Sequence, residues 1–391
     1  MILTLTANPS LDRTIELAGP VLRGQVQRAV WAGQQPGGKG VNVSRAVASA
    51  GRSTRAVLPG DAGDPVLSGL DAIGLAHDSV PTGAPIRSNI TVTEPDGTTT
   101  KINEPGSCLS PETQTELLDL VAALATDADW VVLAGSLPPG VDDDFYARAI
   151  AVIRTLPQPP SIAVDTSGAP LAAALKQSPD LIKPNAEELA ELLGAAGLLG
   201  ETGADDVGLH DSRLADSARS DAEAVEGTFG HPDRGTATQL ATGELHAIAA
   251  RLEASPELTA QATRALLDSA APGPRSILAT LGAGGAVLAA RDAAWHAVHP
   301  PMEVVSTVGA GDSTLAGYLL GRTEGEEPQI ALARAVAYGT AAATLRGTGV
   351  PTPDLIDLGT VTVTPLSNTT PTPTTDQPKQ HAGTAPEAEE A

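Results

Sequence analysis

The stretch STVGAGDSTLAGYLLGR, residues 306–322, joins a glycine-rich turn to a run of small and apolar residues that is typical of a helix. Gly309, Ala310 and Gly311 predict the turn that opens this helix, and Asp312 follows directly. Backbone N–H groups at a helix start have no partner within the helix, and the helix dipole favours negative charge there. The turn could therefore hold a phosphoryl group while Asp312 acts as base toward an attacking hydroxyl. A plain turn with Asp312 as its capping residue explains this stretch alone equally well.

Before this turn, short apolar runs typical of buried strands alternate with runs typical of helices. We expect strands at 2–7, 55–59, 130–135, 161–165, 180–183 and 276–282. We expect helices at 39–51, 64–74, 111–126, 142–156, 168–177 and 185–194. This alternation predicts an α/β fold with a mainly parallel central sheet and helices on both of its faces.

One region interrupts the alternation and predicts a small β lid. Residues 88–106, SNITVTEPDGTTTKINEPG, alternate like strands around the turn signal PDG and predict a hairpin. Residues 12–36 contain too many glycine and proline residues for a helix and could supply further strands. The lid strands are therefore expected within about 12–36 and 86–106.

Two stretches have the composition of disordered chain. Residues 198–240 are rich in Gly, Asp, Ser and Thr, and residues 366–391 are rich in Pro, Thr and acidic residues. We expect one domain over residues 1–365, with a disordered acidic insertion at 198–240 and a disordered tail at 366–391.

The composition argues against several classes of function. The net charge is −23, from 47 acidic and 24 basic residues, and an acidic chain repels nucleic acid and anionic lipid. No apolar run approaches the roughly 18 residues that a membrane-spanning helix needs. The beginning of the sequence has no basic leader before an apolar run, so we expect a cytoplasmic protein. Its single cysteine, Cys108, excludes an intrachain disulfide.

Two further motifs combine glycine or proline with polar residues. In PGGKGVNVSRAVASAG (36–51), Gly38 opens space, Lys39 supplies positive charge and Asn42 can bond hydroxyl groups, as in an anion or sugar site. The alternative is a helix entry with a solvated lysine. In LIKPNAEEL (181–189), Asn185 and Glu188 share a helix face and could hold hydrated Mg²⁺. A capping box explains the same spacing and is favoured by the residues alone.

Weaker signals come from other segments. ATLGAGGAVLA (279–289) predicts a strand, a turn and a strand, where a nucleotide could lie against the backbone, although a plain turn is also consistent. Asp12, after the first strand, could bind sugar hydroxyls or cap a turn. His296 and His299 lie in an alternating run and are expected to be structural.

Taken together, these motifs resemble the signatures of the ribokinase-like (PfkB) carbohydrate kinases. The family's two signatures are similar to GGKGVNVSRAVASAG (37–51) and STVGAGDSTLAG (306–317). GSLPPG (135–140), VDTSG (164–168) and KPNAEE (183–188) follow in the family's order between them. The resemblance implies an α/β domain with a small β lid and phosphoryl transfer from MgATP to a hydroxyl of a sugar phosphate. TANPSLD (6–12) and the predicted hairpin further resemble the branch that phosphorylates fructose 1-phosphate.

The resemblance also implies roles for individual residues. Asp312 would be the base, and Gly309, Ala310 and Gly311 the anion hole. The implied sugar-phosphate contacts are Asp12, Gly38, Lys39, Asn42, Arg87, Lys101, Asn103 and Ser136. The implied ATP contacts are Lys183, Asn185, Thr280, Gly282, Gly285 and Gly311, with Glu188 reaching Mg²⁺ through water. ATP and Mg²⁺ are thus the expected cofactors, and exposed lid strands could pair two copies into a homodimer.

Three alternatives concern the activity. The acceptor could be tagatose 6-phosphate or fructose 6-phosphate, because spacing does not reveal where the sugar carries its phosphate. A non-catalytic sugar-phosphate sensor could lose the base or the anion hole, but this sequence has both. A nucleoside kinase would need an apolar base pocket in place of Lys39 and Arg87. These two cations and Lys101 favour a phosphorylated sugar, since an acidic protein must concentrate positive charge to hold phosphate.

Overall fold

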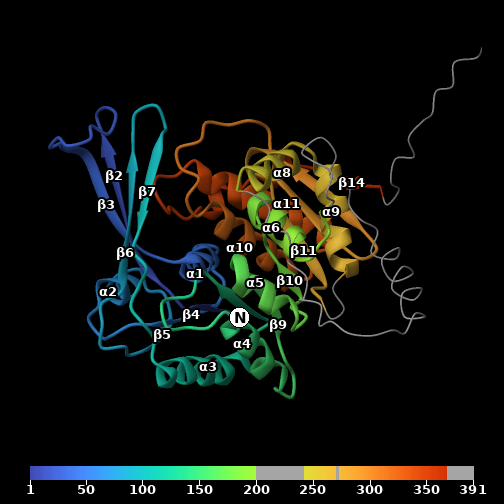
Figure 1. The fold of residues 1–391 in the computed structure, drawn as a ribbon, viewed down its shortest axis with the longest axis horizontal. Coiled ribbons are helices and arrows are strands. Elements are labelled where there is room, and N and C mark those ends of the chain that lie inside the picture. The colour runs from blue at the N-terminus through green and yellow to red at the C-terminus, as the bar shows by residue number, and fades with distance from the viewer. Residues whose placement is uncertain (200–241, 270–272, 368–391) are drawn as a thin grey trace, which may run out of the picture.

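The computed structural model describes residues 1–199, 242–269 and 273–367. They form a large sheet with helices on both faces and a separate four-stranded sheet that extends from the body (Figure 1). The strands of the large sheet are β1 (Ile2–Thr6), β4 (Thr54–Pro59), β5 (His77–Val80), β8 (Trp130–Ala134), β9 (Ser161–Asp165), β10 (Leu181–Ile182), β11 (Ser276–Thr280), β12 (Ala286–Ala290), β13 (Ala294–Val298) and β14 (Thr362–Leu366). The helices are α1 (Lys39–Ser49), α2 (Pro65–Ala72), α3 (Pro111–Ala125), α4 (Phe145–Arg154), α5 (Gly168–Leu175), α6 (Ala186–Ala195), α8 (Thr242–Ala254), α9 (Pro256–Ser269), α10 (Ala310–Thr323) and α11 (Pro328–Ala343).

The large sheet is mainly parallel, which confirms the predicted fold class. Its strand order is β14-β13-β12-β11-β10-β9-β8-β1-β4-β5, and the pairs from β5 through β11 are parallel. At one edge β12, β13 and β14 continue the sheet in antiparallel pairs, which the prediction did not specify. Short turns from β11 to β12 and from β12 to β13 explain the first two of these pairs, because a tight connection can join only antiparallel strands.

Apolar side chains cover both faces of the sheet. Leu3 and Leu5 of β1 belong to a cluster that includes residues of α3, α4, α5, α6, α8 and α9. Ile2 belongs to a second cluster, with residues of α1, α10 and α11. Successive residues of a strand point to opposite faces, so the two clusters lie on either side of one sheet.

The smaller sheet contains β2 (Ser10–Leu17), β3 (Ala29–Gly37), β6 (Arg87–Thr93) and β7 (Thr99–Asn103), in the order β3-β2-β6-β7. β6 and β7 are antiparallel partners, as the predicted hairpin requires, and β2 joins them by parallel pairing with β6. The predicted β lid is therefore confirmed.

Helix α10, which begins within the last glycine-rich motif, packs closely on α11. A Cβ atom added to Gly339 of α11 would lie 2.1 Å from Oγ1 of Thr314 on α10. No larger residue fits at this crossing, so the small residues of the two helices fix the position of the turn that precedes α10.

The predicted disordered segments fall mostly outside the described residues, but both begin differently from the prediction. Leu198 is buried, and its N–H donates a hydrogen bond to the carbonyl of Leu193 at the end of α6. Leu366 ends β14, and its carbonyl accepts a hydrogen bond from Arg264. Composition averages over a segment and therefore misses a single apolar residue that completes the core. Among the described helices, none has the length and hydropathy that a membrane span requires.

Candidate active site

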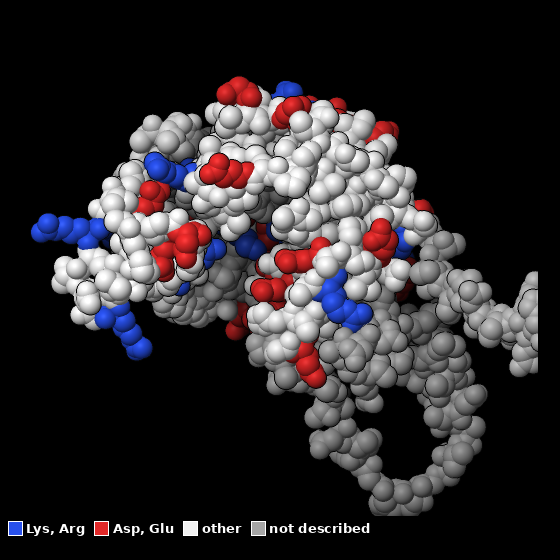
Figure 2. Space-filling model, turned by 90° about the horizontal axis from the view of Figure 1, so that it is seen from above, with Lys and Arg blue, Asp and Glu red and all other residues white. Residues whose placement is uncertain are grey.

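A cavity of about 930 Å³ lies between the lid and the large sheet. Figure 2 shows this hollow from above, with basic and acidic side chains together inside it. Parallel strands end at one edge of their sheet, and the residues that follow β8, β9, β10 and β11 line the cavity there. Every residue predicted for the base, the anion hole, the sugar, the nucleotide and Mg²⁺ also lines it.

The glycine-rich turn before α10 forms one wall. Gly309 is the N-cap residue with a φ of 80°, a left-handed conformation that favours glycine. Ala310, Gly311 and Asp312 are the first three helical residues, so their N–H groups have no partner within the helix. Asp312 is not the capping residue, and no side chain caps this helix. The interpretation of Asp312 as a plain N-cap is therefore wrong.

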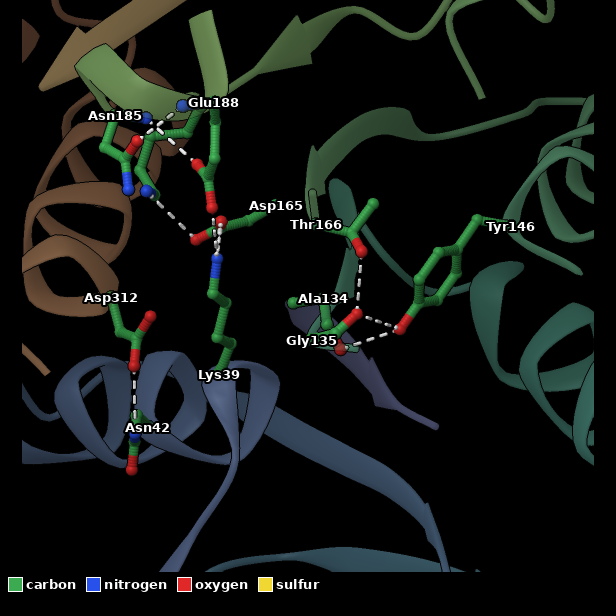
Figure 3. Close-up of polar contacts among 11 residues, drawn as sticks. Lys39, Asn42, Ala134, Gly135, Tyr146, Asp165, Thr166, Asn185, Glu188 and Asp312 are labelled. Atoms are coloured by element: carbon green, nitrogen blue, oxygen red, sulfur yellow. Dashed lines mark hydrogen bonds and ion pairs between the residues drawn. The ribbon is translucent and has the colours of Figure 1, made fainter. Parts of the chain in front are cut away.

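Asp312 is only 7% exposed, and its carboxyl group has a strongly altered acidity. Burial, together with the nearby carboxylate of Asp165, raises the pKa of Asp312 to about 6. Lys39, Lys183 and a 2.8 Å hydrogen bond from Nδ2 of Asn42 to Oδ2 of Asp312 oppose this rise (Figure 3). At neutral pH the group is ionised but much more basic than a surface aspartate, as a proton acceptor requires.

Two lysines and a buried carboxylate form the floor of the cavity. Nζ of Lys39 lies 2.7 Å from Oδ1 of Asp165 (Figure 3). Nζ of Lys183 lies 3.2 Å from Oδ2 of the same carboxylate. Burial would raise the pKa of Asp165, but the two ammonium groups outweigh it and hold that pKa below its usual value. Burial would likewise lower the pKa of Lys39, but Asp165, Glu188 and Asp312 raise it. Asp165 was not among the predicted residues, although its place at the end of β9 could have indicated it.

Asn185 and Glu188 form the capping box that the residues alone favoured. Oδ1 of Asn185 accepts from the N–H of Glu188 at 2.7 Å, and Oε2 of Glu188 accepts from the N–H of Asn185 at 2.9 Å. The other oxygen of Glu188 lies 3.4 Å from Nζ of Lys39. Within the described ranges, no three His, Cys, Asp or Glu side chains are grouped to hold a metal ion. The amide of Asn185 and the carboxylate of Glu188 are oxygen donors of the kind that a hydrated Mg²⁺ accepts.

The predicted strand–turn–strand lies beside this capping box. Thr280 ends β11, and Gly282 and Gly285 flank the tight turn before β12. The N–H of Thr280 donates to the carbonyl of Pro184 at 3.0 Å, which joins the turn to the capping-box segment. His299, which we expected to be structural, also lines the cavity.

The lid contributes both acidic and basic groups. Asp12 lies in β2 rather than in a turn, so the capping interpretation is wrong. Its Oδ1 accepts from Ser10 at 2.7 Å and from Asn89 at 3.2 Å, while burial raises the pKa of Asp12. Arg87 on β6 donates to the carbonyl of Glu104 at 2.8 Å. Lys101 and Asn103 are exposed residues of β7 that line the cavity from the lid.

Comparison with known proteins places the chain in a family. The model of the pfkB family carbohydrate kinases matches residues 5–211 and 238–355. This chain belongs to the pfkB family of carbohydrate kinases. It is 33% identical over 363 residues to a 1-phosphofructokinase of Haloferax volcanii, covering 92% of this chain and 95% of that protein.

Solved structures of this family have the same fold. Phosphofructokinase-2 from Escherichia coli in complex with fructose-6-phosphate matches with a TM-score of 0.65 and 26% identity, over 90% of this chain and 96% of that chain. Ribokinase from Thermotoga maritima matches with a TM-score of 0.58 and 16% identity, over 91% and 97%. The fold is therefore ribokinase-like. The chain is a phosphotransferase of a family whose kinases use ATP.

Sequence reasoning missed the cavity residue Asn8 of this pfkB kinase and the buried residue Tyr146 behind the cavity. Asn8 donates from Nδ2 to Oγ of the predicted residue Ser136 at 3.4 Å and to the carbonyl of Pro105 at 3.1 Å. Behind the strand ends, the hydroxyl of Tyr146 donates to the carbonyl of Gly135 at 2.9 Å (Figure 3). Asn8 lies within the TANPSLD motif and could have been singled out there, whereas nothing local to Tyr146 indicates its place.

Proposed function

We propose that this kinase transfers the γ-phosphoryl group of ATP to fructose 1-phosphate, which yields fructose 1,6-bisphosphate and ADP. The observation that carries this proposal is the carboxylate of Asp312, buried at the start of α10 in the cavity that the basic lid residues also line. The similarity to the Haloferax volcanii 1-phosphofructokinase supports the choice of acceptor.

The reaction needs a base and a group that stabilises charge. Asp312 would take the proton of the acceptor hydroxyl, whose oxygen attacks the γ-phosphorus while the bond to the leaving ADP breaks. The N–H groups of the turn Gly309–Gly311 would stabilise the charge on the transferring phosphoryl group. Lys183, Asn185, Thr280, Gly282 and Gly285 would hold the nucleotide. Mg²⁺ bound to the phosphates, with Glu188 reaching it through water, would neutralise part of their charge.

The cations of the lid are suited to the phosphate that the sugar already carries. Lys39 is paired with Asp165 and Glu188, so most of its charge is offset within the protein. Arg87 donates to a backbone carbonyl. The carboxylates of Asp12 and Glu104 act on its charge, but neither is ion-paired with it, so Arg87 can still attract an anion. Lys101 lines the cavity from β7. We therefore assign the sugar phosphate chiefly to Arg87 and Lys101, with Asp12, Asn42, Asn103 and Ser136 near the sugar. A sugar without phosphate would not need two cations there.

The alternative acceptors are fructose 6-phosphate and tagatose 6-phosphate. The first is favoured by the solved complex of the Escherichia coli enzyme with fructose-6-phosphate. A coupled assay of ADP release should compare fructose 1-phosphate, fructose 6-phosphate, tagatose 6-phosphate, fructose and ribose at saturating MgATP. We expect the highest kcat/KM with fructose 1-phosphate. A higher kcat/KM with another ketose phosphate would refute fructose 1-phosphate as the acceptor but would leave the proposed mechanism unchanged. Binding of a sugar phosphate without turnover on any sugar would instead support the sensor alternative.

We also propose that the kinase forms a homodimer through its lid. β3 is an edge strand of the four-stranded sheet, and Val30 on it is 64% exposed. Ile102 on the opposite edge strand, β7, is 57% exposed. An open edge with apolar side chains is a surface that proteins usually cover, and a second copy of this lid would cover it.

A further inference from the structure

Arg45 is a buried cation of α1 that lies within the first glycine-rich motif, and neither the sequence analysis nor the proposed mechanism gives it a role. It is 8% exposed and joins three parts of the chain. From lid strand β3, Oε1 of Gln35 accepts from Nη2 at 3.0 Å and the carbonyl of Pro36 accepts from Nη1 at 3.2 Å. From the segment after α11, the carbonyl and Oγ1 of Thr348 accept from Nη1 at 3.2 and 3.4 Å. From α1 itself, Oδ1 of Asn42 accepts from Nη1 at 3.3 Å.

The last of these contacts determines how Asn42 faces Asp312. An asparagine amide has one accepting oxygen and one donating nitrogen. Because the oxygen of Asn42 accepts from Arg45, its nitrogen points the other way and donates to Oδ2 of Asp312 at 2.8 Å. If the amide were reversed, its nitrogen would face the donor Nη1 of Arg45 and its oxygen would face the carboxylate oxygen of Asp312. Both contacts would then be repulsive.

The other contacts connect Arg45 to the lid. In the lid sheet Gln35 of β3 is paired with Asp12 of β2, so both side chains lie on one face of the sheet. Oγ1 of Thr348 also donates to Oε1 of Gln35 at 2.9 Å, which links the segment after α11 to the same side chain. The position of β3 thus determines where the acceptors around Arg45 lie, and Arg45 determines the orientation of the Asn42 amide.

We propose that Arg45 is a positioning residue that couples the lid to the base. Lid strand β3 and Thr348 hold the guanidinium of Arg45, and the guanidinium orients the amide of Asn42. The amide in turn directs Asp312 toward the acceptor hydroxyl. This inference rests on the proposed role of Asp312 as the base. It makes base orientation depend on the placement of the lid, so a sugar phosphate that contacts the lid also helps to align the base.

The coupling also has an electrostatic part. The charged groups around Asp312 are Lys39 and Arg45 of α1, Asp165 of β9, and Lys183 after β10. Arg45 also lies near the carboxylate of Asp12 on β2, whose pKa it lowers. Arg45 is a cation that favours the ionised form of Asp312, and the amide hydrogen bond that Arg45 orients favours it too. Loss of Arg45 therefore removes two contributions of the same sign, and the base should need a higher pH to ionise.

The test compares Arg45→Met with Gln35→Ala, which removes one lid contact of Arg45 without touching Asn42 or Asp312. Arg55→Met is the matched control, because Arg55 pairs with Asp78 between β4 and β5 and does not line the cavity. For Arg45→Met we expect kcat to fall about 10- to 100-fold. We also expect the acidic limb of its kcat–pH profile to lie at higher pH than in the wild type. Gln35→Ala should also lower kcat and move the acidic limb to higher pH, but by smaller amounts. Arg55→Met should change neither kcat nor the acidic limb.

A double-variant cycle separates this proposal from a merely structural effect. If Arg45 acts through the base, Arg45→Met should have almost no further effect on kcat in an Asp312→Asn background. An equal fold-loss in both backgrounds, or a lower kcat with an unmoved acidic limb, would overturn the proposal. If Arg45→Met does not fold, as judged by its thermal transition, Gln35→Ala decides by the same criteria. Near-normal turnover of Asp312→Asn would instead overturn the proposed function itself.

Discussion

Nζ of Lys39 lies 2.7 Å from Oδ1 of Asp165, a carboxylate that is completely buried beneath the cavity. Lys183 approaches the other oxygen of the same carboxylate at 3.2 Å. The three groups carry one net positive charge beside Asp312. Asp165 raises the pKa of Asp312, whereas Lys39 and Lys183 lower it, so the acidity of the base depends on a balance of opposite charges.

This balance predicts opposite shifts for two substitutions. Asp165→Asn keeps the side chain's shape but removes a negative charge, so the pKa of Asp312 should fall and the acidic limb of the kcat–pH profile should move to lower pH. Lys39→Met removes a positive charge and should move that limb to higher pH. Profiles measured at saturating substrates between about pH 5 and 8 would check both, because that range spans the acidity of a general base near neutrality. Lys176→Met, at an exposed lysine outside the cavity, is the control, and shifts of the same sign in both variants would contradict the balance.

Removal of the base itself should separate chemistry from binding. In Asp312→Asn the amide still accepts the hydrogen bond from Asn42 but cannot take a proton. We expect kcat to fall about 10²- to 10⁴-fold, the usual contribution of a general base. The dissociation constant of the sugar phosphate, measured by calorimetry, should change little. A variant that keeps wild-type turnover would exclude Asp312 as the base.

The same substitution should make the protein more stable at neutral pH. The pKa of Asp312 is raised to about 6 in the fold, above its ordinary value of 3.8, so the fold favours the protonated carboxyl. The protonated carboxyl of Asp312 therefore adds to the free energy of unfolding below about pH 4, and this contribution is lost as pH rises through about 6. Asp312→Asn avoids the loss because it never ionises. Its melting temperature should exceed that of the wild type at pH 7.5 by more than at pH 5, and an equal difference at both values would contradict the raised pKa.

The sequence predicts those parts of the site that depend on neighbours along the chain. The capping box of Asn185 and Glu188 follows from residues three positions apart, and the turn before Asp312 follows from glycines ahead of a helical run. The hydrogen bond from Asn42 to Asp312 spans 270 positions and follows only from the packing of α1 on α10. No local pattern announces it.

The residues that sequence reasoning missed have distant partners. Asp165 ends a buried strand, and only the fold shows that two lysines face it. Arg45 lies in an alanine-rich helix and looks like a solvated residue of that helix. Apart from Asn42 on the same helix, its acceptors are on β3 and on Thr348, which is 303 positions away. Side chains of this kind are placed by tertiary packing, which single-sequence patterns do not contain.

The proposed sugar-phosphate contacts can be tested on the lid. Lys101→Ala should raise KM for fructose 1-phosphate about tenfold or more, since a charge-assisted hydrogen bond contributes about 1.5–3 kcal/mol. The KM for ATP should change less than twofold. Arg87→Ala should act in the same direction, although its bond to the carbonyl of Glu104 also supports the lid. Activity on unphosphorylated fructose is the internal control, and an equal loss with fructose and fructose 1-phosphate would show that these cations do not contact the phosphate.

The proposed dimer can be tested at the exposed edge of the lid. Val30→Glu places a charge on edge strand β3, where apolar contact and strand pairing with a second copy would both be lost. Light scattering coupled to gel filtration should show twice the chain mass for the wild type and the mass of one chain for Val30→Glu. Ile330→Glu is the matched control, because Ile330 is also an exposed apolar residue but lies on α11, away from the lid. A wild-type protein that elutes with the mass of one chain at tens of micromolar would refute the dimer. A dimer that Val30→Glu leaves intact while Ile330→Glu dissociates it would place the interface on α11 instead.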